Sequence, residues 1–150
     1  MCESVDMSSD VHTTASLQLR HVNQRLTSSR AALLDVLAGA KRPMTIAEIL
    51  EANKGFAQSS VYRNLMVLEQ AAVVRRILTS DEYARYELAE NHTGHHHHLV
   101  CSNCGAVEDI PSSPRLEKAV DQLVSEVHNT AGFKTVQHRV DLVGLCSNCA

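Results

Sequence analysis

The sequence predicts an α+β protein in which an N-terminal winged helix-turn-helix is followed by a small α/β domain with a three-stranded sheet and one long helix. Three observations support this fold class. Helical periodicity extends over residues 16–72, a β-hairpin pattern follows at residues 73–88, and the order strand, strand, helix, strand fills residues 96–143. The 150 residues provide room for one ordinary domain or two small ones.

The first part of the chain predicts an arm followed by helices. Residues 1–15 are small, polar and acidic and lack periodicity, which predicts a flexible arm. A first helix is expected to start near Ser16. Thr27 is suited to the N-cap of a second helix, which Gly39 and Pro43 would end.

Two further helices have start signals of their own. Thr45 is followed three residues later by a glutamate, which is a capping-box pattern for a short helix, Ile46–Asn53. Gln58 or Ser59 is expected to cap a third main helix over residues 59–72. Its apolar residues share one face, because they lie four, seven and eleven positions apart: Val61, Leu65, Leu68 and Ala72.

A β-hairpin pattern follows the helices. Residues 73–78 and residues 83–88 are typical of two strands, and the polar residues 79–82 between them are typical of a turn. The three helices that start at Thr27, at Thr45 and at Gln58 or Ser59 form, together with the hairpin, a winged helix-turn-helix, which we assign to residues 16–90.

The second half predicts strands at residues 96–101 and 105–110, a helix at residues 115–131 and a last strand at residues 135–143. A three-stranded sheet with one helix cannot bury both of its faces. We therefore expect residues 91–150 to pair with a second copy and to form a dimerisation domain. The apolar stripe of the helix consists of Leu116, Val120, Leu123, Val124 and Val127.

Composition excludes several classes of protein. Apolar runs such as Ala71–Val74 reach four residues, whereas a membrane span needs about 20, so we expect no membrane partner. The N-terminal residues lack the apolar stretch of a signal peptide, which favours the cytoplasm. The five aromatic residues are too few for a platform that stacks single-stranded nucleic acid.

Charge is divided unevenly along the chain, whose net charge is −3 with neutral histidines. Residues 11–80 carry nine Lys and Arg against four Asp and Glu, whereas residues 81–150 carry five against ten. A basic first half and an acidic second half suggest a polyanionic partner for the first and cations for the second.

Two Cys-Ser-Asn-Cys knuckles are the most specific motif. Cys101, Cys104, Cys146 and Cys149 supply four thiolates for a closed tetrahedral site of the kind that binds Zn²⁺. A redox dithiol or two disulfides are the alternatives. The duplicated knuckle and a cytosolic setting, where disulfides are rare, favour structural zinc with no open position for catalysis.

A run of four histidines at residues 95–98 leads directly into the first knuckle. An expression tag and a solvated polar loop are the simpler explanations, but a tag would be terminal and longer. Because alternate side chains of an extended chain point to opposite sides, His96 and His98 face one way and His95 and His97 the other. This geometry favours two metal sites back to back.

The first of these sites needs a carboxylate from the preceding hairpin. Glu87, at the end of the hairpin, is best placed to join His96 and His98. Glu90 or His92 is expected to supply a fourth ligand.

The second site is expected to use the helix and the last strand. Glu117 begins the helix at residues 115–131, and His138 lies on the apolar face of the last strand, which would pack on that helix. His95 and His97 would then meet both residues. A histidine satisfied within the core is the equal alternative for His138.

The first turn of the third main helix is polar. In a helix-turn-helix this turn enters the major groove, where such side chains contact phosphates and base edges. Basic residues around it, including Arg25 and Arg30, support double-stranded DNA as the partner. The candidate contacts on the helix are Ser59, Ser60, Tyr62, Arg63 and Asn64.

Together these motifs resemble the ferric uptake regulator family of metal-dependent transcription factors over about residues 16–150. The resemblance implies a homodimer with N-terminal winged helices and a C-terminal dimerisation domain. It also implies that metal closes the dimer onto a pseudo-palindromic, A·T-rich operator and usually represses transcription. It rests on Arg25-Leu-Thr-Ser-Ser-Arg30, Ser60-Val-Tyr-Arg63, Tyr86-Glu-Leu88, the run from His95 to Gly105, and His138 eight residues before Cys146.

By position, the resemblance assigns a role to each candidate residue. The four cysteines match the structural zinc site, Tyr62 and Arg63 match recognition-helix contacts, and Arg30 matches a phosphate contact. The sensor site would include Glu87, His96 and His98, and an additional site would comprise His95, His97, Glu117 and His138.

The chain departs from the family pattern at three places. Pro43 stands where iron-type members have a sensor histidine, Arg75 where zinc-type members have an aspartate, and Ala89 near the place of their sensor cysteine. Another residue must then link the winged helix to the sensor site. The candidates are Glu90, His92, His12 and His21.

We therefore expect a metal-responsive repressor of metal homeostasis genes and not an enzyme. Fe²⁺ is slightly favoured as the regulatory ion; Zn²⁺ is the alternative, as in a zinc uptake regulator, and Mn²⁺ or Ni²⁺ suits the same ligands. A metal-dependent hydrolase that uses Glu87, His96 and His98 would lack an added base. A metal store without DNA binding is the remaining alternative.

Overall fold

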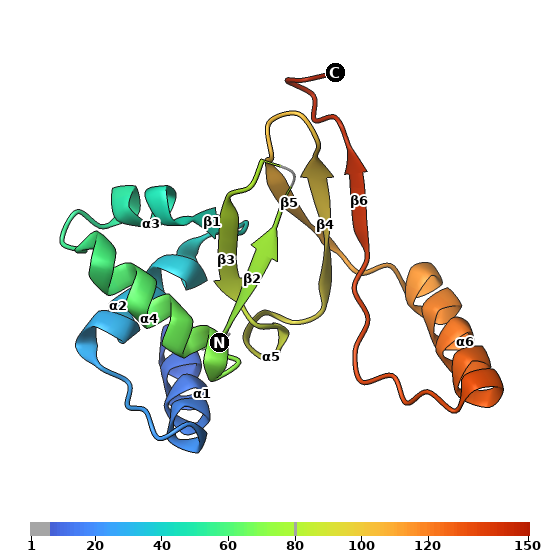
Figure 1. The fold of residues 1–150 in the computed structure, drawn as a ribbon, viewed down its shortest axis with the longest axis horizontal. Helices are drawn as coiled ribbons and strands as arrows, with labels where there is room; N and C mark the ends of the chain where they lie inside the picture. Colours follow the sequence, from blue (N-terminus) through green and yellow to red (C-terminus); the bar gives the residue numbers. More distant parts are fainter. Residues whose placement is uncertain (1–6, 80) are drawn as a thin grey trace, which may run out of the picture.

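A computed structural model describes residues 7–79 and 81–150, which form two units (Figure 1). The N-terminal unit consists of α1 (Met7–His21), α2 (Ser28–Gly39), β1 (Met44–Thr45), α3 (Ile46–Ala52), α4 (Gln58–Gln70), β2 (Val74–Leu78) and β3 (Ala84–Leu88). The C-terminal unit consists of α5 (Glu90–Thr93), β4 (His96–Cys101), β5 (Val107–Pro111), α6 (Pro114–Ala131) and β6 (Asp141–Gly144). The predicted α+β class is confirmed, with a winged helix first and an α/β unit second.

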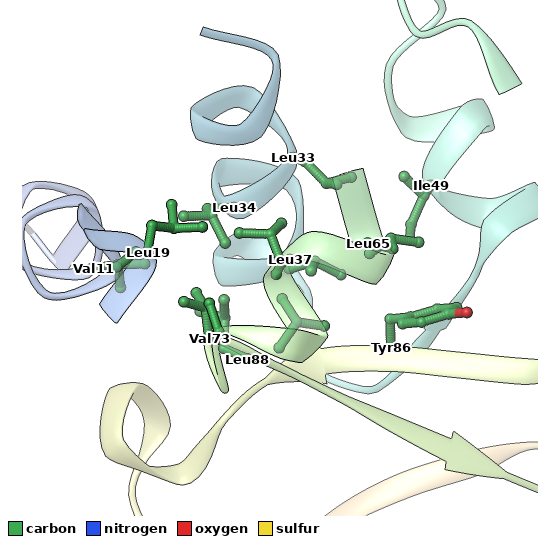
Figure 2. Close-up of a cluster of buried hydrophobic side chains, with 14 of the residues drawn as sticks. Val11, Leu19, Leu33, Leu34, Leu37, Ile49, Leu65, Val73, Tyr86 and Leu88 are labelled. Atoms are coloured by element: carbon green, nitrogen blue, oxygen red, sulfur yellow. The ribbon is translucent and has the colours of Figure 1, made fainter. Parts of the chain in front are cut away.

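The helices of the N-terminal unit pack around an aliphatic core (Figure 2). Leu34 of α2 and Leu65 and Leu68 of α4 are at most 1% exposed. On α4 the buried Val61, Leu65 and Leu68 share one face, as the predicted spacing requires. The opposite face of α4 is therefore free to carry polar residues at the surface. The prediction is wrong for Ala72, which is exposed in the turn after the helix ends at Gln70.

The predicted caps at Thr27 and Thr45 are confirmed. The Thr27 side chain accepts a hydrogen bond from a backbone N–H of α2, and Thr45 forms the predicted capping box. The N-cap of α4 is Ala57, which makes no side-chain hydrogen bond, so the prediction of Gln58 or Ser59 is wrong. Both of those residues belong instead to the first turn of the helix.

The first helix begins earlier than predicted. It starts at Met7 and not near Ser16, so the prediction of a flexible arm is wrong for residues 7–15, while residues 1–6 lie outside the described part of the chain. The polar composition hides three apolar residues at a spacing of four, which form the face of α1 that packs into the core. They are Val11, Ala15 and Leu19.

Each unit has a small sheet. In the N-terminal unit the order is β1-β3-β2, with antiparallel pairs. In the C-terminal unit the order is β5-β4-β6, with β4 antiparallel to β5 and parallel to β6. The two-residue β1 and the single-turn α5 are too short for a sequence pattern and were not predicted. Because β4 is central, its side chains reach both faces of the second sheet.

The last strand is shorter than predicted. β6 begins at Asp141, whereas residues 135–143 were expected to be extended throughout. In the parallel register Asp141 lies opposite His98, and β4 begins at His96. Residues 135–138 therefore have no strand beside them with which to form a ladder.

Helix α6 stands to one side of the second sheet (Figure 1). None of its residues is buried, and Leu123 of its apolar stripe is 58% exposed. The prediction that the last strand packs on this helix is thus wrong for the single chain. Leu142 and Val143 of β6 are also exposed, and these apolar surfaces are consistent with the expected pairing with a second copy. Within the described residues, no helix combines the length and apolarity that a bilayer crossing requires.

Leu65→Ala is expected to lower the free energy of unfolding by about 2–5 kcal/mol, because a core side chain is replaced by a cavity. Urea unfolding followed by circular dichroism measures the change. The adjacent Met66 is 70% exposed, so Met66→Ala is the matched control and should change stability by only about 0.5 kcal/mol. Equal losses in the two variants would contradict this placement of the core.

Candidate metal centres and nucleic-acid interface

Four cysteines converge where β4 and β6 end. The strands are parallel, with Cys101 opposite Gly144, so the two knuckles lie at the same edge of the sheet. The sulfur atoms of Cys101, Cys104, Cys146 and Cys149 all lie within 4.8 Å of one another. The sulfurs of Cys104 and Cys146 are 3.8 Å apart. This separation suits two ligands at about 2.3 Å from a tetrahedral zinc ion and is far longer than a disulfide bond of about 2.05 Å.

The knuckle backbone favours the thiolate form of Cys101. The backbone N–H groups of Cys104 and Cys146 point at the sulfur of Cys101 and lower its pKa to about 6. The thiolate is the form that binds metal. Four sulfur ligands complete a tetrahedral shell, so the donor set fits a structural zinc ion and leaves no position for a substrate.

A second cluster, which we call the hinge cluster, consists of Glu87, His96, His98 and Asp109. One ligand atom from each residue lies within 4.8 Å of the others. The Nε2 atoms of His96 and His98 are both 3.2 Å from Oε2 of Glu87. Asp109 lies opposite His98 in the β4–β5 pair, with Oδ1 3.7 Å from Nε2 of His98. Because Glu87 belongs to β3, the cluster draws ligands from both units.

The charge of Glu87 dominates the hinge cluster. Its side chain is buried, and burial would raise its pKa, but hydrogen bonds from His98 and Arg75 lower the pKa to about 2. Burial lowers the pKa of His96, but the carbonyl of Gly94 and the carboxylate of Glu87 outweigh burial and raise it. Glu87 is thus ionised at neutral pH and attracts cations.

A third cluster, which we call the helix cluster, consists of His95, His97, Glu117 and His138. Their ligand atoms also lie within 4.8 Å of one another. Glu117 of α6 places Oε1 2.8 Å from Nε2 of His97 and Oε2 3.1 Å from Nε2 of His138. The Nε2 atoms of His95 and His138 are 2.9 Å apart. His138 therefore faces other potential ligands, and the structure brings together all four residues predicted for this site.

The histidines present their Nε2 atoms to the clusters because Nδ1 is engaged elsewhere in three of them. A carbonyl or carboxylate acceptor holds a proton on Nδ1 and leaves a lone pair on Nε2, the usual arrangement for a metal ligand. Neutral imidazoles and carboxylates together fit Zn²⁺, Fe²⁺, Mn²⁺ or Ni²⁺. The Nδ1 contacts are His95 to Glu90 at 3.0 Å, His96 to the Gly94 carbonyl at 3.0 Å and His98 to Asp141 at 3.3 Å.

The structure places Glu90 and His92 outside the hinge cluster, which corrects the prediction that one of them is its fourth ligand. Glu90 accepts a hydrogen bond from Arg75 through one oxygen and contacts His95 through the other. Nε2 of His92 lies 2.9 Å from the side-chain oxygen of Gln18 on α1, and burial lowers the pKa of His92. Both side chains are thus engaged by other parts of the chain.

Sequence reasoning missed Asp109, which takes the fourth place in the hinge cluster. The signal was available only through strand pairing, because Asp109 lies opposite His98 in a register that was not predicted. The other two candidates do not join the cluster: His12 lies 2.8 Å from Asp35, and His21 is exposed at the end of α1.

The first turns of α4 present most of the predicted nucleic-acid contacts to solvent. Ser59, Tyr62 and Arg63 are exposed, and Ser60 is partly exposed. Arg25 is exposed in the loop before α2. These residues offer hydroxyl and guanidinium donors at the surface of the winged helix, as phosphate and base contacts require.

Arg30 and Asn64 are instead tied to each other. Arg30 is 9% exposed, and its guanidinium donates hydrogen bonds to the side chains of Asn64 and Gln24 and to the carbonyl of Arg25. This network fixes α4 against the start of α2. The phosphate contact expected of Arg30 stays a prediction, because the donors that the structure shows are used within the chain.

Comparison with known proteins identifies relatives over most of the chain. The sequence profile described as the ferric uptake regulator family matches residues 21–143. The peroxide operon regulator of Bacillus subtilis is 30% identical over 136 residues, which cover 88% of each chain. The ferric uptake regulation protein of the same species is 31% identical over 138 residues, which cover 88% of this chain and 89% of that protein.

Solved structures share the fold. The Helicobacter pylori ferric uptake regulator, whose structure is described as revealing three functional metal binding sites, matches with a TM-score of 0.74 at 23% identity and covers 95% of this chain and 93% of its own. The Pseudomonas aeruginosa ferric uptake regulator with manganese matches with a TM-score of 0.68 at 28% identity and covers 87% of this chain and 96% of its own.

Cys146→Ser is expected to abolish tightly held zinc, because three thiolates and a weak hydroxyl ligand cannot replace four thiolates. Metal analysis by mass spectrometry after dialysis against a mild chelator measures the zinc content per chain. Cys2→Ser is the matched control, since Cys2 belongs to neither knuckle, and it should keep the wild-type zinc content. Undiminished zinc in Cys146→Ser would contradict the four-cysteine site.

Proposed function

Because this chain belongs to the ferric uptake regulator family, we propose that it is a metal-responsive, DNA-binding transcriptional repressor that controls metal homeostasis genes. Members of the family are transcription regulators and not enzymes. The expectation that the protein is not an enzyme is therefore confirmed, and the hydrolase alternative is dropped.

The observation that carries the proposal is the origin of the hinge-cluster ligands. Glu87 comes from β3 of the winged-helix unit, whereas His96, His98 and Asp109 come from β4 and β5 of the second unit. The four ligand atoms meet in only one relative arrangement of the two units. A bound divalent cation would supply the attraction that favours this arrangement over others.

The ligand types of each cluster determine how readily a bound ion would be released. Two imidazoles and two carboxylates in the hinge cluster hold a divalent ion less firmly than four thiolates do. We therefore assign a permanent zinc ion to the four cysteines and the regulatory ion to the hinge cluster. The helix cluster is proposed as an additional site for a divalent ion.

Iron is our first choice for the regulatory ion, because the hinge cluster contains only nitrogen and oxygen donors. Zinc is the alternative, which would make the protein a zinc uptake regulator, and Mn²⁺ or Ni²⁺ suits the same donors. Pro43 is buried and offers no ligand, so the histidine that iron-type members have at this place has no counterpart here.

The proposed partner is a pseudo-palindromic double-stranded DNA operator bound by a homodimer. Exposed Tyr62 and Arg63 on α4 would read one half-site in each protomer. The unpacked apolar surface of α6 and β6 would pair with the second copy. We propose the cytoplasm as its compartment, because it holds DNA and keeps thiols reduced.

Divalent metal is expected to tighten operator binding at least about tenfold. Duplexes enriched from a random double-stranded library by the Mn²⁺-loaded protein serve as the operator, and gel-shift titration at fixed salt measures the affinity. His98→Ala should lose the metal response, and Arg63→Ala should weaken binding by about tenfold or more. Lys134→Ala, exposed in the second unit, is the control. Equal affinity with and without metal in the wild type would refute a sensor.

Removal of the cysteine-bound zinc is expected to dissociate the dimer, because the knuckles fasten β6 to β4 beside the exposed Leu142 and Val143. Sedimentation velocity of the wild type, with and without a strong chelator, measures the association state. Cys101→Ser should sediment as a monomer at concentrations where Cys2→Ser is a dimer. A stable Cys101→Ser dimer would show that zinc is not needed for pairing.

A further inference from the structure

Arg75 of β2 contacts two carboxylates: Glu87, which belongs to the hinge cluster, and Glu90, which contacts a histidine of the helix cluster. Its guanidinium donates hydrogen bonds to Oε1 of Glu87, in the hinge cluster, and to Oε1 of Glu90, at 2.9 Å. The other oxygen of Glu90 lies 3.0 Å from Nδ1 of His95, in the helix cluster. A continuous chain of charged hydrogen bonds thus runs from Glu87 through Arg75 and Glu90 to His95.

The contact between Glu90 and His95 decides which ring nitrogen of His95 carries a proton. An ionised carboxylate can only accept hydrogen bonds, so Nδ1 of His95 must be the donor. In a neutral imidazole the other nitrogen, Nε2, is then a lone pair. That atom lies 2.9 Å from Nε2 of His138 and 3.5 Å from Oε2 of Glu117, inside the helix cluster.

Arg75 in turn fixes the carboxylate. Its side chain is 24% exposed and is held between Glu87 and Glu90, whose own side chains are 8% and 30% exposed. Glu90 begins the single-turn helix α5 at the connection between the two units, and the N-cap of this helix, Ala89, makes no side-chain hydrogen bond. A guanidinium that binds two carboxylates at once is a geometrically specific anchor for both.

We propose that Glu90 and Arg75 are positioning residues that couple the two clusters: Glu90 sets the ring form in which His95 can ligate a divalent cation, and Arg75 connects Glu90 to Glu87. Neither residue is a ligand. The proposal rests on the proposed metal binding of the clusters, but not on DNA binding.

The link gives the coupling a direction. When Glu87 shares its charge with a cation in the hinge cluster, its attraction for Arg75 weakens, and Arg75 binds Glu90 more closely. Glu90 is then a poorer acceptor for His95, so occupation of the hinge cluster should lower the affinity of the helix cluster.

The first test reads the ring form of His95 without any ion in the helix cluster. Long-range ¹H–¹⁵N spectra of the zinc-retaining, full-length protein at about pH 8, where free imidazole is neutral, should show a proton on Nδ1 of His95. In Glu90→Gln the side-chain amide can donate to Nδ1, and the proton should move to Nε2. Glu126→Gln, an exposed change on α6, should leave the spectrum unaltered. A merely structural role of Glu90 would not reverse the ring form.

The second test measures the affinity of the helix cluster for Co²⁺ and Zn²⁺ by chelator competition in a His98→Ala background, which disables the hinge cluster. Addition of Glu90→Gln should lower this affinity about 10- to 100-fold, whereas Glu126→Gln should not change it. An unchanged affinity or an unchanged ring form would overturn the role of Glu90.

The third test measures the affinity of the helix cluster for a divalent ion in two states. In the first state the hinge cluster is intact and saturated with metal, and in the second it is disabled by His98→Ala. In the wild type the intact, saturated hinge cluster should weaken the second site at least about fivefold. In Arg75→Gln only the direct repulsion between the two ions remains, so the factor should be smaller. The same factor in both proteins would overturn the link through Arg75. Failure of wild-type protein to bind an operator would refute the proposed function but leave these three results unaffected.

Discussion

The ionised carboxylate of Glu87 is buried at the junction of the two units, and its charge determines what must surround it. An isolated buried carboxylate is costly unless cations and hydrogen-bond donors offset the loss of water. Arg75 of the neighbouring strand engages one oxygen, and the imidazoles of His96 and His98 approach the other. The charge of Glu87 therefore holds three segments close together. They are the end of the β2–β3 hairpin, the connection between the units and the first half of β4. A divalent ion bound there would strengthen an arrangement that the chain already favours.

The three clusters differ in the chemistry of their potential metal ligands. Four sulfur atoms at one end of β4 would complete the shell of a zinc ion, whereas the nitrogen and oxygen atoms at the other end would hold a divalent ion that exchanges more readily. Both kinds of site belong to the same six-residue strand, because alternate side chains of His96–Cys101 serve opposite faces and its last residue begins a knuckle. A change at the four-cysteine site would thus act directly on the strand that carries His96 and His98.

Sequence patterns were sufficient for features that depend on neighbours along the chain. The caps at Thr27 and Thr45, the buried stripe of α4 and the back-to-back histidines all follow from local spacing. Features that depend on register or on distant charges were not accessible. Asp109 joins the hinge cluster through strand pairing, and Glu90 is drawn to His95 and Arg75 and away from the predicted position. The start of β6 likewise depends on where its partner strand begins, and polar residues concealed the buried face of α1.

The parallel pairing of β4 with β6 has a consequence for how the protein is made. His98 and Asp141 are adjacent in space but separated by a long stretch of chain that includes α6. Closing so large a loop costs entropy before any contact compensates for it, and such non-local pairing forms slowly. During translation the winged helix can fold from residues that leave the ribosome early, whereas the zinc ligands are incomplete until Cys149 has emerged. A nascent chain is therefore able to fold α4 long before its four-cysteine site and the pairing of β4 with β6 can form.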